Sequence, residues 1–126
     1  MKNNLLSDKA MAFAVRVCNL CKYLVDSGNE KIISRQLFKS GTSIGANIAE
    51  ALCAESDADF VHKLRIARKE ASETIYWLEL LCRTKYIDEK GAMSMQADCE
   101  ELVKIMTSTI LTMDNKINKN NIASKA

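Results

Sequence analysis

The residues best suited to chemistry in this chain are its cysteines and its single histidine. Cys18 and Cys21 form a Cys-x-x-Cys pair, and the remaining cysteines are Cys53, Cys82 and Cys99. A zinc site normally has a second pair of ligands, and the thioredoxin motif belongs to a βαβ unit, but neither is visible in the sequence. An odd number of cysteines along apolar, helix-like segments is typical of reduced thiols. We therefore expect Cys18 and Cys21 to pack in the interior, with metal or redox chemistry as the alternative.

The histidine, His62, is the other candidate for a metal ligand. Di-iron carboxylate enzymes built on helical bundles use two Glu-x-x-His pairs and two further glutamates. Here Asp59 precedes His62 by three residues, and the sequence has no second histidine. It also has no phosphate-binding glycine loop and no Gly-x-Ser-x-Gly elbow. We therefore predict a protein that is not an enzyme and needs no cofactor, with His62 on a helix surface. A metal-binding bundle enzyme is the less favoured alternative.

Basic side chains offer a different chemistry, the binding of phosphate groups. The formal net charge of +2 is too small to indicate nucleic acid by itself, so the placement of the charges matters. Lys31, Arg35 and Lys39 follow at four-residue steps, and the sequence has no acid between Lys31 and Ala49. The candidate phosphate contacts are Lys22, Lys31, Arg35, Lys39, Arg65, Arg68 and Lys69. The alternative is that these side chains form an ordinary solvated surface.

The elements that position these residues are predicted to be helices. The chain has no proline, and aromatic residues make up 6% of it, which favours helices over strands. Apolar periodicity predicts helices at about 7–27, 30–52, 57–85 and 88–116, with a polar, disordered tail at 117–126. A chain of 126 residues is expected to form one domain. Short turns between long helices predict an antiparallel up-down-up-down four-helix bundle.

The predicted ends of these helices depend on capping residues. Ser7 is an expected N-cap, and Gly28 is expected to end the same helix in the left-handed conformation. Ser56, with Asp59 three residues later, resembles a capping box, and Asp88 is the expected N-cap of the last helix.

The helix predicted at 30–52 combines an apolar stripe with small residues. The stripe consists of Ile33, Leu37, Gly41, Ile44, Ile48 and Leu52. Gly41 and Gly45 each cost about 1 kcal/mol relative to alanine inside a helix. We expect a neighbouring helix to approach closely at the glycines and offset that cost. Asn47 and Glu50 either form an ordinary polar helix surface or bond to a partner helix or to the backbone of the following turn.

The helix predicted at 7–27 is apolar around too much of its circumference for one core. One apolar row consists of Ala10, Phe13, Val17, Leu20 and Leu24, and a second row consists of Met11, Val15, Cys18 and Val25. A single bundle core cannot cover both rows. We therefore expect this helix to lie in a subunit interface. The alternative is a helix buried more deeply than its neighbours.

Membrane insertion and secretion are not expected. No apolar run approaches the 18 or more residues of a membrane span, and the polar start MKNNLLSDK does not read as a signal peptide. The sequence therefore favours a cytoplasmic protein without a membrane partner.

Over about residues 13–113, the chain resembles the four-helix bundle family named for proteins encoded in intervening sequences of bacterial 23S rRNA genes. The resemblance lies in SGTSIGANIAEA at 40–51 and in the helix that begins near Phe60. The matching motif residues are Ser43, Ile44, Asn47, Ile48, Ala49, Glu50, Phe60, Ile66 and Ala67. The chain departs from the family pattern at Gly45, where the family often has proline, and at Ala51, where it often has glycine.

The resemblance implies a homo-oligomer, a ring of five bundles. The fold is also similar to that of accessory proteins of diversity-generating retroelements, which are pentameric barrels that bind nucleic acid and a reverse transcriptase. RNA or DNA binding is therefore the functional hypothesis that the resemblance favours. The alternative is a protein-interaction scaffold that binds another protein through the ring surface or through the methionine-rich fourth helix.

Overall fold

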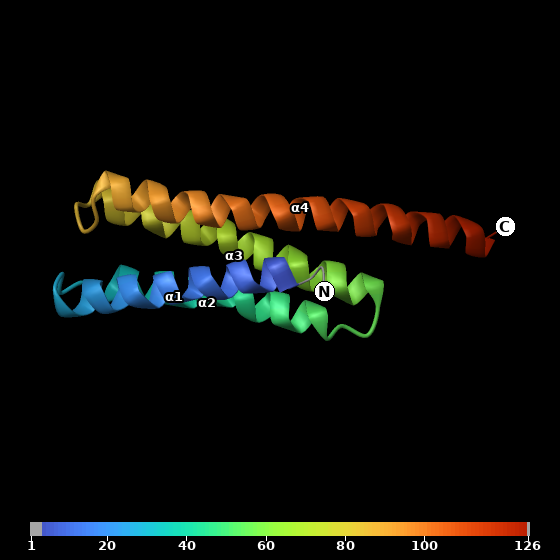
Figure 1. Cartoon of the computed structure of the whole chain (residues 1–126), viewed down its shortest axis with the longest axis horizontal. Helices are drawn as coiled ribbons and strands as arrows, with labels where there is room; N and C mark the ends of the chain where they lie inside the picture. The colour runs from blue at the N-terminus through green and yellow to red at the C-terminus, as the bar shows by residue number, and fades with distance from the viewer. Residues whose placement is uncertain (1–3, 126) are drawn as a thin grey trace.

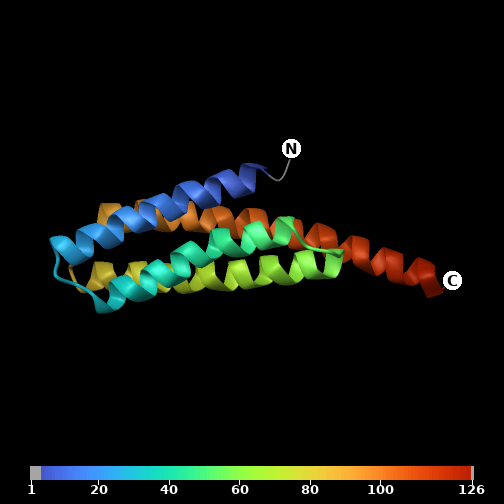
Figure 2. The same cartoon turned by 90° about the horizontal axis from the view of Figure 1, so that it is seen from below.

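The computed structural model describes residues 4–125 and consists of four α-helices. They are α1 (Asn4–Asp26), α2 (Ile32–Leu52), α3 (Asp57–Arg83) and α4 (Glu89–Lys125). Each helix runs opposite to the one before it (Figure 1), and α1 lies beside α4 as well as α2 (Figure 2). The predicted all-α domain of four consecutively packed helices is therefore confirmed.

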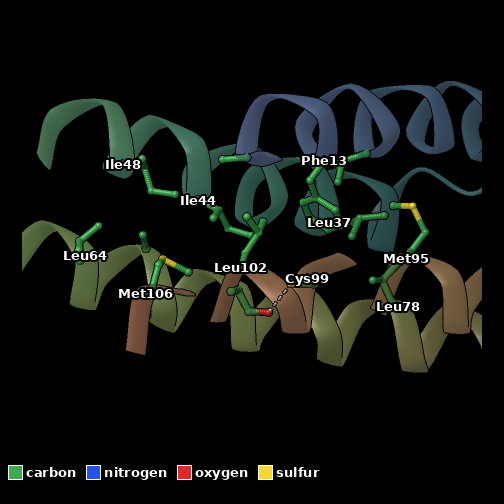
Figure 3. Packing of buried hydrophobic residues seen from close by; sticks show 14 of the residues in the cluster. Phe13, Leu37, Ile44, Ile48, Leu64, Leu78, Met95, Cys99, Leu102 and Met106 are labelled. Carbon is green, nitrogen blue, oxygen red and sulfur yellow. Dashed lines mark hydrogen bonds between the residues drawn. The ribbon is translucent and has the colours of Figure 1, made fainter. Parts of the chain in front are cut away.

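The core lies along the axis of the bundle and takes side chains from every helix. Phe13, Leu37, Leu78 and Leu102 are each no more than 2% exposed, and Figure 3 shows them converging from the four helices. Burial of each such side chain stabilises the fold by about 1.5–3 kcal/mol. The packing of these apolar rows holds the helices in their observed order.

The buried face of α2 differs in part from the predicted stripe. Leu37, Ile44 and Ile48 are buried as predicted, whereas Ile33 is partly buried and Leu52 is exposed. The other buried positions of this helix are Ser34, Ser40, Gly41 and Ala51. The predicted positions recur at slightly more than 3.6 residues per turn, so the stripe drifts around the helix and its first and last members, Ile33 and Leu52, lie at opposite edges of the buried face. Small residues therefore occupy four of the seven buried positions of α2.

Two of the buried polar residues, Thr74 of α3 and Ser40 of α2, face one another. Their hydroxyl oxygens are 2.9 Å apart, and the Thr74 hydroxyl also bonds to the carbonyl oxygen of Glu70 at 2.8 Å. Pairing removes most of the cost of burying the two groups. Within the described chain, no buried side-chain nitrogen or oxygen lacks a hydrogen-bond partner.

Gly41 lies at a close approach of α1 to α2, which confirms the prediction for this glycine. A Cβ atom on Gly41 would lie 2.8 Å from Cγ2 of Val17, which is fully buried. At Gly45, by contrast, a Cβ atom would lie 3.6 Å from Cβ of Ala10, an ordinary contact. Only the first glycine is therefore required by packing within this chain.

The helix ends confirm two of the predicted caps. The Asp59 amide donates to the Ser56 hydroxyl at 3.0 Å, and the Gly91 amide donates to the Asp88 carboxylate at 2.6 Å. The prediction for Ser7 is wrong, because α1 begins at Asn4 and Ser7 lies inside it.

The prediction for Gly28 is also wrong. The left-handed residue after α1 is Asn29, with φ of 53°. A Cβ atom on Gly28 would lie 2.9 Å from the Leu24 carbonyl oxygen, so crowding against α1 accounts for the glycine.

Glu30 supplies a cap that the sequence did not predict. Its carboxylate accepts hydrogen bonds from the amides of Ser34 at 2.7 Å and Ile32 at 3.3 Å, and the residue is 7% exposed. A negative charge at a helix N-terminus is favourable because the free amides there carry partial positive charge. The first amides of α2 therefore already have an internal acceptor.

The predicted disordered tail is wrong for residues 117–125, which continue α4. No proline or glycine follows Gly91 to end the helix, and Met113 and Ile117 extend its apolar row onto the core. Lys116 also bonds to Asp57 at the start of α3, at 3.3 Å. The last part of α4 projects beyond the end of the bundle (Figures 1 and 2). No helix within residues 4–125 has the length and hydrophobicity needed to cross a membrane.

The two glycines of α2 predict opposite effects of alanine. Gly41→Ala should destabilise the protein by about 1 kcal/mol or more, because overpacking against the stiff Val17 side chain outweighs the gain in helix propensity. Gly45→Ala should instead stabilise it by up to about 1 kcal/mol. Urea unfolding of both variants measures the difference. A Gly41→Ala variant as stable as Gly45→Ala would show that Val17 does not limit the approach of α1.

Candidate functional site

The buried cysteines have the properties of packed thiols. The Cys21 thiol lies 3.4 Å from the Ser34 carbonyl oxygen, and the Cys99 thiol lies 3.3 Å from the Ala71 carbonyl oxygen. Burial raises the pKa of Cys21 and raises that of Cys99 to about 12, with nearby carboxylates adding to the shift of Cys99. A thiol that keeps its proton is a poor nucleophile and a poor metal ligand. The structure thus places Cys21 in the core as predicted and leaves Cys18 half-buried.

His62 is exposed on α3, as predicted. Within residues 4–125, no cluster of three or more histidine, cysteine or acidic side chains has the geometry to hold a metal ion.

Three of the seven candidate phosphate contacts lie together. Lys22 of α1 and Lys31 and Arg35 at the start of α2 line one groove of about 600 Å³ between the two helices. The same groove is lined by Val25 and Phe38, which are 37% and 49% exposed. The α1–α2 groove, as we call it, therefore combines an apolar floor with cations.

The other four candidates lie outside the α1–α2 groove. Arg65 bonds to Asp114 of α4 at 2.6 Å, so a carboxylate already neutralises its charge. Arg68 contacts the Thr107 hydroxyl at 3.4 Å, also across the α3–α4 seam. Lys39 and Lys69 are exposed on α2 and α3. The structure therefore does not gather the seven residues into one surface.

The polar residues of the family motif differ in their partners. The Ser43 hydroxyl donates to the Lys39 carbonyl at 2.6 Å, and Asn47 donates to the Ser43 carbonyl at 2.8 Å, so both bond within α2. The prediction of a partner for Asn47 outside its own helix is therefore wrong. It is confirmed for Glu50, whose carboxylate accepts from Lys63 of α3 at 3.0 Å and raises the pKa of that lysine.

Most apolar residues of the motif belong to the core. Ile44, Ile48 and Ala67 are buried, while Phe60 and Ile66 are partly buried. Ala49 differs from them, because it is exposed on α2.

The second apolar row of α1 lies outside the bundle. Met11, Val15 and Val25 are 67%, 52% and 37% exposed, while the first row faces the core. The alternative of an α1 buried more deeply than its neighbours is therefore wrong. This exposed row continues from the N-terminal half of α1 into the α1–α2 groove.

Residues 2–108 match a family model described as 23S rRNA-intervening sequence protein. The chain belongs to the 23S rRNA-intervening sequence protein family. A crystal structure of a protein with unknown function from the S23 ribosomal protein family of Bacteroides thetaiotaomicron is 53% identical to it, with a TM-score of 0.85. That alignment covers 87% of this chain and 98% of the other. No curated protein matches the chain.

The family match confirms the predicted resemblance. It includes α1, α2 and α3 in full and ends at residue 108, inside α4. The projecting end of α4 therefore lies outside the part of this 23S rRNA-intervening sequence protein that the family model describes.

Sequence reasoning missed Phe38 as a candidate site residue. Periodicity places it off the core stripe of α2, but an exposed phenylalanine has no distinct signal in a single sequence. Its neighbours are a better indication, since Lys31 and Arg35 precede it by seven and three residues and therefore lie near it on the helix.

The raised pKa of Cys99 predicts that stability falls in alkaline solution. The unfolded thiol has an ordinary pKa of 9.0, whereas burial raises the pKa of the folded Cys99 thiol to about 12. The folded state then holds more protons, so its stability is complete below pH 9 and decreases as the pH rises toward 12.

Urea unfolding at pH 8 and pH 10 tests this expectation. The wild type should lose about 1 kcal/mol more than Cys99→Ala over that interval. Cys53→Ala, which removes an exposed thiol, should keep the wild-type dependence. The same pH dependence in wild type and Cys99→Ala would contradict the assignment.

Proposed function

We propose that this protein is a non-enzymatic homo-oligomer that binds RNA or DNA through basic residues repeated around a ring. The observation that carries the proposal is the surface of α1 and α2, where an exposed apolar row adjoins the cationic α1–α2 groove. The apolar row supports self-association, and the groove supports phosphate binding.

Self-association is supported by the N-terminal half of α1. Met11 and Val15 lie one helical turn apart on the same face of α1, and both are more than half exposed. On α2, Ala46 and Ala49 are exposed small residues that would allow another helix to approach. A second copy of the chain would remove this surface from water. The resemblance to ring-forming proteins makes five the expected number of copies.

Nucleic-acid binding is supported by the charge of the groove. Among residues 4–125, none of the ion pairs includes Lys22, Lys31 or Arg35. A ring would repeat these three cations in every copy and create a surface of high positive potential from a subunit with little net charge. Because the Bacteroides relative is described as a member of a ribosomal protein family, RNA is the first probe. We expect binding that depends strongly on salt and weakly on sequence.

The alternative of a protein-binding scaffold has less support from α4. Of its methionines, Met95 is 5% exposed and Met106 is fully buried. Met93 is 63% exposed, so the predicted methionine-rich surface is reduced in extent.

Self-association is tested by replacing the exposed α1 row. Wild type should sediment as a multiple of the 14.1 kDa subunit, five for the proposed ring. Met11→Gln/Val15→Gln should shift the protein toward monomer, because it makes the contact polar. Met93→Gln/Leu111→Gln is the matched control, since both residues are 63% exposed and lie on α4. A folded, monomeric wild type at micromolar concentration would overturn the ring.

Phosphate binding is tested by titrating RNA and DNA with protein at salt concentrations between about 50 and 200 mM. Lys22→Gln/Lys31→Gln/Arg35→Gln should weaken binding and reduce the slope of log affinity against log salt by about 2 for a single strand. The matched control, Lys85→Gln/Lys90→Gln/Lys104→Gln, removes the same charge from exposed positions on other surfaces. No binding by the wild type at low salt would favour the scaffold.

A further inference from the structure

We propose that the α1–α2 groove binds a nucleotide of a single-stranded nucleic acid, with the base stacked on Phe38 and the phosphates held by Lys22, Lys31 and Arg35. The inference rests on the proposed function and deepens it by naming the form of nucleic acid and the residues that distinguish it.

The floor of the α1–α2 groove is apolar. Phe38 is 49% exposed and Val25 is 37% exposed, so half of an aromatic side chain and part of an aliphatic one face water. The volume of about 600 Å³ lies within the range of about 300–1,000 Å³ that is typical of small-ligand sites. A planar base fits this floor because it covers apolar surface with its π-face while its polar edge stays near solvent.

The α1–α2 groove also carries an excess of positive charge. Three basic side chains and one carboxylate, Asp26, line it, so the local charge favours an anion. The amides at the N-terminus of α2 do not supply this charge, since the Glu30 carboxylate already accepts from Ile32 and Ser34. A phosphate in the groove therefore depends on Lys22, Lys31 and Arg35.

The combination of an exposed aromatic ring and cations in one groove favours a single strand over a duplex. In a duplex the faces of the bases are stacked on one another and cannot reach a side chain in a groove, and only the backbone meets the protein. Single-strand binding sites combine a cationic path for the backbone with aromatic side chains for the bases. The α1–α2 groove has both the cations and the aromatic side chain, because Lys31, Arg35 and Phe38 lie on one face at the start of α2.

A second copy of the chain is the competing occupant of the same groove. Burial of this half of the face against protein would take three cations out of water against one carboxylate, which is costly without further acids from the partner. Met11 and Val15, in the N-terminal half of the α1 row, suit self-association better, because the neighbouring Lys9 and Arg16 are already paired with Glu101 and Asp98 of α4.

The test compares a uniform single strand with a duplex of the same length in equilibrium titrations of the intact oligomer. Phe38→Leu keeps the apolar floor but removes the ring, and should weaken single-strand binding by about 5- to 100-fold without changing the salt slope. Phe38→Tyr should retain the affinity. The matched control is Tyr76→Leu, which removes an aromatic ring that is 60% exposed on α3.

Tryptophan fluorescence can report stacking directly, because Trp77 is the sole tryptophan of the chain and can be replaced. In a Phe38→Trp/Trp77→Phe variant, the indole lies in the groove, and the single strand should quench its fluorescence more than the duplex does. Sedimentation of each variant reports whether the oligomer is unchanged.

Each result supports or overturns the inference. Wild-type affinity of Phe38→Leu for the single strand, with no quenching in the tryptophan variant, would overturn the stacking site and leave the proposed function standing. Loss of the oligomer in Phe38→Leu would assign the groove to contact between copies. Absence of any nucleic-acid binding by the wild type would remove the proposed function itself, and this inference with it.

Discussion

The close contact between Val17 of α1 and Gly41 of α2 determines how α1 lies on the bundle. The absence of a side chain on Gly41 lets the fully buried Val17 reach the backbone of α2. Since Val17 is fixed there, the residues on its own face of α1 point to the core, and the row of Met11, Val15 and Val25 is turned toward solvent. The apolar surface available for other molecules is therefore a consequence of one tight helix contact.

Packing also decides which cations are available to a ligand. The seams of α4 are joined by ion pairs, Arg16 with Asp98 on one side and Arg65 with Asp114 on the other. These pairs are part-exposed, and each contributes at most about 1 kcal/mol to stability, but they use side chains that would otherwise face a phosphate. The α1–α2 seam is packed through small and apolar residues instead, and the lysines and arginine along it keep their charge for solvent or a partner.

The sequence predicted those features that depend on spacing along a helix. The four helices, the cap of Ser56, the burial of Leu37, Ile44 and Ile48, and the outward row of α1 all follow from periodicity or local chemistry. The cap from Glu30 was not predictable in the same way, because the backbone must first turn at Asn29 before the carboxylate can reach α2. Likewise, four-residue spacing placed Lys39 with Lys31 and Arg35, but a groove is formed by two helices, and Lys22 of α1 joins it instead.

The hydrogen bond between the Thr74 and Ser40 hydroxyls favours one alignment of α2 along α3. Leucine and isoleucine side chains interdigitate in many alignments, and a displacement by one turn could preserve most of their contacts. Such a slide would break the bond between the two hydroxyls, which is worth about 0.5–1.5 kcal/mol, and would leave each with only the carbonyl of its own helix, Glu70 for Thr74 and Leu37 for Ser40. A seam otherwise built from interchangeable apolar contacts therefore has one preferred alignment.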